Sequence, residues 1–165
     1  MKKVFYILIT VCFLLSGEVY SQATATFTAS ATIIQPIGIT TTSNMNFANI
    51  DARSGGAVIL TPENTRISSG GVELAEGANV SAAEFEVTGE AGYSFSVSLP
   101  KTHYELTNGS ETMILKDFTS SITEGGQIAE GSKTIRVGAT LDINPNQTPG
   151  YYTSKGSMEV SVNYN

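Results

Sequence analysis

The residue types that could do chemistry are few and scattered in this sequence of 165 residues. His103 is its single imidazole and Cys12 is its single thiol. A general base or a metal ligand needs partners within reach, and the sequence gives no reason to place an acid or a second ligand beside His103. We therefore interpret His103 as a residue of a connecting loop, and we predict neither nucleophilic catalysis nor a zinc site.

A second candidate is a segment that offers oxygen ligands at alternate positions, like the start of a calcium-binding loop. Its residues are, in order, Asp142, Ile143, Asn144, Pro145 and Asn146. However, Gln147 stands where such a loop needs a glycine, and Thr153 stands where it needs a bidentate glutamate. The pattern therefore favours a turn closed by asparagine and proline over a metal site.

A third candidate is a cluster of carboxylates formed by Glu84, Glu86 and Glu90. Paired carboxylates cleave glycosides only across a cleft that sets their separation. Glu84 and Glu86 alternate with apolar residues, so they share the polar face of one predicted strand, which favours a solvated surface. The sequence thus predicts no catalytic, cofactor-binding or metal-binding residue, and we do not expect an enzyme.

The composition excludes further classes of protein. Only 15% of the residues are charged and the formal net charge is −6, which argues against a basic nucleic-acid-binding protein, a coiled coil or a charge-driven disordered chain. The length is that of one domain with a sizeable core.

The N-terminus has the order of a secretory signal peptide. Lys2 and Lys3 precede a nearly unbroken apolar stretch of 12 residues, Val4–Leu15, and a plausible cleavage site follows Ser21. The stretch is too short for a stable membrane anchor. We predict a signal peptide over residues 1–21 and a secreted or cell-surface location, with the periplasm as an alternative.

Removal of this segment changes the chemistry of the chain. Cys12 lies inside the apolar stretch, so the mature chain, residues 22–165, has no thiol. Loss of Lys2, Lys3 and Glu18 leaves 7 basic and 14 acidic residues, a net charge of −7. An exported domain without disulfides depends on its core and its backbone ladders for stability.

The elements that must position all these residues are strands. Apolar and polar side chains alternate with period two in five segments: Ala25–Ile33, Glu84–Val87, Tyr93–Leu99, Thr134–Leu141 and Ser157–Tyr164. Glycine and asparagine turns separate the segments, and Thr88–Tyr93 is predicted to form a hairpin. No helical periodicity occurs after residue 21. The pattern predicts one antiparallel β-sandwich domain over residues 22–165, with a barrel as the alternative.

A set of short motifs carries a family resemblance. They are, in order, Gly56–Val58, Thr61–Pro62, Arg66, Ser69–Val72, Phe85–Gly89, Leu99–Pro100, Leu106–Gly109, Val137–Leu141, Pro149–Tyr152 and Val160–Asn165. Over about residues 45–165 the chain resembles domain-of-unknown-function family 4402, a family of exported bacterial proteins. The resemblance implies export and an immunoglobulin-like β-sandwich, and it carries no catalytic residue.

The two ends of the mature chain add a looser similarity. Tyr164 is the penultimate residue, and Gly150 lies 14 positions before it. In these features the chain is similar to subunits of bacterial fimbriae and to spore-coat-like surface proteins. Small alternating side chains, as in Ala25–Ile33, fill a neighbour's groove by strand addition. Thr24–Ile34 equally fits the first strand of its own sandwich, and we expect this pairing because most edge strands belong to their own fold.

Taken together, these features predict a secreted or cell-surface β-sandwich with a structural or adhesive role, such as a fimbria-like subunit. Its partners would be copies of itself or other surface proteins, bound through strand edges. The alternative is a carbohydrate-binding module that binds a glycan. The chain has no tryptophan to stack on a sugar ring. Four tyrosines would stack on sugar rings if exposed: Tyr93, Tyr104, Tyr151 and Tyr152. We expect no nucleic-acid partner and no membrane span in the mature chain.

Overall fold

The computed structural model describes residues 21–77, 79–123 and 125–165, and the chain divides into two units at residues 33 and 34. The predicted signal peptide lies outside the described residues except for Ser21. The described residues include no helix long and apolar enough to cross a membrane.

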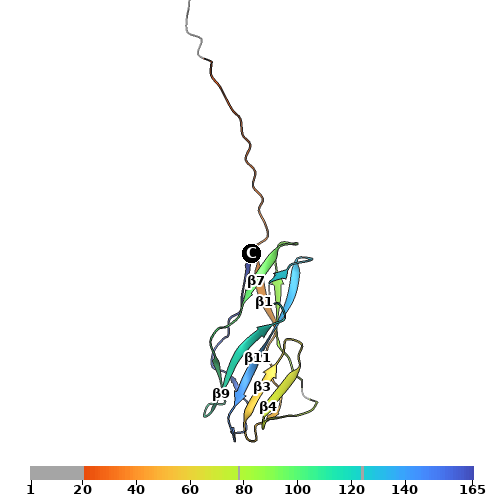
Figure 1. The fold of residues 1–165 in the computed structure, drawn as a ribbon, viewed down its shortest axis with the longest axis vertical. Coiled ribbons are helices and arrows are strands. Elements are labelled where there is room, and N and C mark those ends of the chain that lie inside the picture. The colour runs from red at the N-terminus through yellow and green to blue at the C-terminus, as the bar shows by residue number, and fades with distance from the viewer. Residues whose placement is uncertain (1–20, 78, 124) are drawn as a thin grey trace, which may run out of the picture. The chain divides into compact units, whose positions relative to one another are not determined.

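Every regular element among the described residues is a β-strand, and every strand pair is antiparallel (Figure 1). The strands are β1 (Gly38–Ser43), β2 (Ile50–Asp51), β3 (Gly56–Leu60), β4 (Arg66–Gly70), β5 (Glu73–Leu74), β6 (Ala83–Thr88), β7 (Ser94–Ser98), β8 (Tyr104–Thr107), β9 (Thr112–Ser120), β10 (Gly126–Gln127), β11 (Ser132–Ile143), β12 (Thr153–Ser154) and β13 (Ser161–Tyr164). The prediction of an all-β, antiparallel fold is confirmed.

The strands form three sheets. The largest has the order β1-β6-β11-β9-β8-β12. Outside this linear order, β3 pairs with β11 and also with β4. A second sheet has the order β10-β7-β13, and a third pairs β2 with β5. The largest sheet packs against the second one in the manner of a sandwich, because Val87 and Ile135 from the first share a buried cluster with Phe95 and Val162 from the second.

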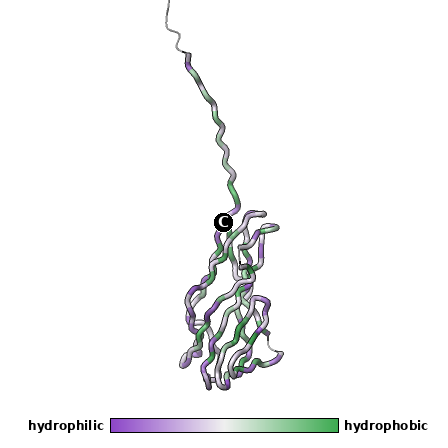
Figure 2. Tube along the Cα trace, viewed as in Figure 1, coloured by the Kyte–Doolittle hydropathy of each residue, from purple (hydrophilic) through white to green (hydrophobic). Residues whose placement is uncertain are grey.

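The long strand β11 connects two hydrophobic clusters. Its alternate residues are buried from Ile135 to Ile143, as period two requires of a strand with one covered face. Hydrophobic and hydrophilic stretches are interspersed along the chain of this unit (Figure 2). Ile135 belongs to the cluster beneath the sheet β10-β7-β13. Leu141 and Ile143 belong to a second cluster with Val58 and Leu60 of β3. The two clusters together give the unit Ile34–Asn165 its core.

The segment Thr88–Tyr93 does not form the predicted hairpin. β6 pairs with β1 and β11, whereas β7 pairs with β10 and β13 in the other sheet. Both edges of β6 are therefore occupied, and the connection passes from one sheet to the other. The prediction was wrong because a turn-rich link between two alternating strands looks the same in sequence whether or not the strands pair.

The alternating segment Ala25–Ile33 also differs from expectation. It contains no strand, and the first strand of the fold is β1. Residues 21–33 are exposed throughout, and the side chains of Phe27 and Ile33 are 92% and 97% exposed. We call residues 22–33 the tail. The tail has the alternation of a strand, but no described residue of the tail is assigned to a strand, so the expectation that it forms the first strand of its own sandwich is not met.

Candidate strand-acceptor groove

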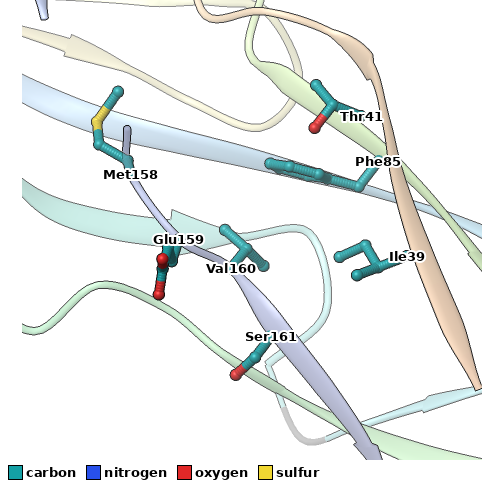
Figure 3. Close-up of a pocket in the computed structure, with 7 residues that line it drawn as sticks. All are labelled: Ile39, Thr41, Phe85, Met158, Glu159, Val160 and Ser161. Carbon is teal, nitrogen blue, oxygen red and sulfur yellow. The ribbon is translucent and has the colours of Figure 1, made fainter. Parts of the chain in front are cut away.

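An open groove lies between β1, at the edge of the largest sheet, and the last segment of the chain. Its volume is about 290 Å³. The lining residues come from β1, from β6 and from the approach to β13: Ile39, Thr41, Phe85, Met158, Glu159, Val160 and Ser161 (Figure 3). We call this feature the edge groove.

The apolar lining of the edge groove follows from strand register. Thr41 stands opposite Phe85 in the ladder between β1 and β6, so their side chains lie on the same face of the sheet. Ile39, Phe85 and Val160 point toward one another, while Glu159 points away (Figure 3). Ile39, Phe85 and Val160 pack against the hydrophobic cluster beneath the sheet β10-β7-β13 without being fully buried. The groove therefore exposes apolar surface that continues the core.

The two sides of the groove are strand edges. In the described part of the chain, β1 pairs only with β6, and β13 pairs only with β7. The backbone N–H of Asn165 donates to the carbonyl oxygen of Ser94 at 3.1 Å, on the β7 side. Because backbone groups alternate along an antiparallel strand, the N–H and C=O groups of Val162 and Tyr164 face the groove side. The groove thus combines an apolar floor with unsatisfied strand-edge groups.

The candidate chemical residues do not come together. His103 is exposed in the loop between β7 and β8. In the segment compared with a calcium-binding loop, Asp142 pairs with Lys116, whose Nζ lies 2.6 Å from Oδ2. This hydrogen bond and the charge of Asp142 raise the pKa of Lys116 above its ordinary value of 10.5. Among the described residues, no three His, Cys, Asp or Glu side chains are grouped as metal ligands.

Two of the three clustered glutamates bind separate partners. Oε2 of Glu84 accepts a hydrogen bond of 2.7 Å from Nε of Arg136 on the neighbouring strand β11. Oε2 of Glu90 accepts the backbone N–H of Gln35 at 2.9 Å. Glu86 is exposed on β6. Glu84 and Glu90 therefore stabilise a strand pair and a loop, and the three carboxylates do not form a pair across a cleft.

The four tyrosines do not make one sugar-stacking surface. Tyr104 and Tyr152 pack against the second hydrophobic cluster, which contains Leu141 of β11 and Leu60 of β3. The hydroxyl of Tyr152 also donates to the carbonyl oxygen of Thr148 at 2.7 Å. Tyr93 is 42% exposed and lies edge-on to Tyr164, and only Tyr151 is broadly exposed, at 87%.

The comparisons with known proteins give a family match and no activity. The family described as Domain of unknown function (DUF4402) matches residues 37–164, most of the chain. The chain belongs to this family. The DUF4402 match spans β1 to β13, including both sides of the edge groove, and it begins after the tail. No curated protein and no solved structure gave a significant match.

Sequence reasoning missed the edge groove itself. One feature of the sequence does indicate it. The alternation of the last predicted strand begins at Ser157, with Met158 and Val160 as its first apolar residues. The structure pairs only Ser161–Tyr164 of that segment, so these two apolar residues remain beside an open edge. Which strands border an opening depends on long-range pairing, which period-two patterns do not specify.

Proposed function

We propose that this protein is a secreted or cell-surface structural subunit that assembles with copies of itself by strand addition. In this assembly the tail of one copy enters the edge groove of another and pairs with the edges of β1 and β13. The observation that carries the proposal is that one chain holds both an open groove between two strand edges and a segment with the alternation of a strand that is assigned to no strand in the described part of the chain.

The groove supplies what an added strand needs. Unpaired backbone groups along a strand edge are a template for another strand, and main-chain hydrogen bonds then provide the affinity. The partly exposed side chains of Ile39, Phe85 and Val160 would be covered by the incoming strand. Covering such surface stabilises a complex by roughly 25 cal/mol per Å² of apolar area removed from water.

The tail matches this site in chemistry. Its apolar residues occupy alternate positions: Ala23, Ala25, Phe27, Ala29, Ala31 and Ile33. The residues between them are threonines and one serine, and β-branched threonine is favoured in strands. No residue of the tail is charged, so its insertion buries no ion.

The tail also matches the groove in length. A strand rises about 3.3 Å per residue, so the 12 residues of the tail reach roughly 40 Å when extended. The stretch of seven residues from Met158 to Tyr164 needs about 23 Å on the same scale. The tail is therefore long enough to span the groove and still leave a short link to its own domain.

The test uses the purified chain from Gln22 onward, analysed by unboiled SDS gel electrophoresis and by sedimentation. We expect a ladder of SDS-resistant oligomers that is lost when residues 22–33 are deleted. The deleted chain should stay folded, since every buried core residue of the described chain lies between Phe47 and Val162. A full chain that stays monomeric at high concentration would refute the proposal.

Substitutions in the groove provide a matched pair of variants. Val160→Asp places a charge on the apolar floor, so it should abolish the ladder while the circular dichroism stays unchanged. Ile67→Asp is its control, because it places the same charge on an apolar residue of β4 that is 51% exposed and does not line the groove. If both variants assemble like the unaltered chain, the edge groove is not the acceptor.

A further inference from the structure

Three hydrogen bonds hold the start of the folded unit to its end. The hydroxyl of Tyr164 donates to the carbonyl oxygen of Gln35 at 2.8 Å and accepts the backbone N–H of Glu90 at 2.7 Å. The backbone N–H of Gln35 in turn donates to Oε2 of Glu90 at 2.9 Å. Both backbone polar groups of Gln35 are therefore engaged. We call this arrangement the Gln35 clasp.

The surroundings of the clasp are fitted to the tyrosine hydroxyl. A Cβ at Gly89 would overlap the hydroxyl oxygen of Tyr164, so only glycine leaves room for it. The ring of Tyr164 lies edge-on to Tyr93, with ring centroids 5.6 Å apart. The hydroxyl is thus placed by packing on both sides.

Strand addition between copies has an internal competitor. The tail is connected to β1 through only a few residues, Ile34 to Ile37. A segment on so short a link would reach the groove of its own chain at an effective concentration on the order of millimolar. Unless something opposes this closure, each copy would fill its own groove and no polymer would grow.

The link Ile34–Gln35–Pro36–Ile37 opposes closure by its backbone chemistry. Return of the tail along the open edge of β1 requires a hairpin across this link, either with Gln35 and Pro36 as a two-residue loop or with all four link residues as the loop. The favoured two-residue turns need a positive φ at the first loop residue. The type I turn of a four-residue loop would place Pro36 at its third position, where proline forces the preceding residue out of the helical region. Gln35 is not among the described residues with positive φ, and the residue before a proline is held to extended conformations. The clasp fixes Gln35 in this non-hairpin conformation.

We propose that the Gln35 clasp, together with Pro36, reserves the tail for the groove of a second copy by preventing it from folding back into its own. Tyr164 is the positioning residue of this device, and it acts on the tail through Gln35. This inference rests on the proposed function and adds a determinant of which groove the tail enters.

Two variants of the full mature chain test the inference. Gln35→Asn with Pro36→Gly installs an Asn-Gly pair, which favours the tight hairpin. Tyr164→Phe removes the hydroxyl and keeps the ring. We expect the SDS-resistant ladder to fall at least about tenfold in the double variant, and in Tyr164→Phe by a smaller factor. The product should be a folded monomer whose Val160 and Val162 amides are protected from hydrogen exchange.

The control is Tyr93→Phe, which removes the hydroxyl of the adjacent tyrosine and should assemble normally. Amide protection in a monomer separates self-closure from simple unfolding, since an unfolded variant would exchange rapidly at both valines. If the unaltered chain forms the ladder and both clasp variants form as much, the inference fails and the proposed function stands. If the unaltered chain forms no ladder, the proposed function fails, and the inference fails with it.

Discussion

Nη1 of Arg66 donates a hydrogen bond of 2.8 Å to the carbonyl oxygen of Phe47. The same guanidinium donates from Nη1 to the carbonyl oxygen of Asn49 at 3.0 Å and from Nη2 to that of Ala75 at 2.8 Å. Arg66 opens β4, whereas its three partners lie in the loops around β2 and β5. One side chain therefore holds the small sheet to the large one, using the fixed fork of donors that only arginine provides.

Replacement of Arg66 by lysine should destabilise the domain even though the charge is kept. An ammonium group cannot reach all three carbonyl oxygens from one position, which leaves backbone acceptors without partners. We expect Arg66→Lys to lower the free energy of unfolding by about 1–3 kcal/mol, measured by urea denaturation followed by circular dichroism.

Arg53→Lys is the matched control for this change. Arg53 pairs with Asp51 and Glu73, and its side chain is 53% exposed. Exposed ion pairs contribute about 0–1 kcal/mol, so this variant should unfold almost like the unaltered chain. Equal losses in the two variants would show that Arg66 is no more than a surface charge.

Substitution of Gly138 by alanine should disturb the contact between β11 and β3. A Cβ at Gly138 would overlap the carbonyl oxygen of Leu60, a backbone atom that cannot move aside cheaply. We expect Gly138→Ala to cost about 1–3 kcal/mol of unfolding free energy, in the range of other overpacked sites. Gly156→Ala should be nearly neutral, since a Cβ there meets nothing within 4 Å. A neutral Gly138→Ala variant would contradict the close approach of the two strands.

The sequence predicts well those strands that have one face buried and the other exposed. The alternation over Thr134–Leu141 lies within β11, because one side of that strand packs against both hydrophobic clusters. It cannot predict which strand pairs with which. Thr88–Tyr93 connects strands of two different sheets, although its turn residues are typical of a hairpin. Ala25–Ile33 contains no strand, although its alternation is typical of one. Pairing is decided by distant edges, and a period of two residues contains no information on them.

The candidate site was less accessible to sequence reasoning than the fold. Titratable residues such as His103 and Glu84 attract attention by their type, yet they lie in separate places and have structural partners or exposed positions. The edge groove is made of ordinary apolar residues and backbone groups, which have no distinctive motif. Tyr164 stands out in the sequence by its penultimate position, whereas its hydrogen bond to Gln35 exists only in the folded chain.

The stability of the domain at alkaline pH should depend on Lys116. Asp142 raises the pKa of Lys116 above 10.5, chiefly through their hydrogen bond. Folding therefore favours the protonated amine. The stabilisation is complete below pH 10.5 and is lost as the pH rises through the folded-state pKa.

A comparison of melting temperatures checks this dependence. As the pH rises from 8 to 12, through the ordinary lysine value of 10.5, the unaltered chain should lose more thermal stability than Lys116→Met, because the variant lacks the titrating group. The difference between the two chains isolates the contribution of Lys116. Parallel curves across this range would show that the pair contributes nothing to folding.

Strand alternation should determine which face of the tail packs into the edge groove. Phe27 is the largest side chain on the apolar side of the tail, and Thr28 points to the opposite side of an extended strand. Burial of one phenylalanine contributes about 1.5–3 kcal/mol, so Phe27→Ala should weaken assembly by about 10- to 100-fold. Thr28→Ala should leave assembly almost unchanged.

The measurement is the fraction of SDS-resistant oligomer as a function of protein concentration, with the two variants prepared in the same full mature chain. The tail lies outside the core, so neither substitution should alter the melting temperature of the monomer. If Thr28→Ala weakens assembly as much as Phe27→Ala, the tail does not insert with its alternating apolar face toward the groove, and assembly through this edge must be rejected.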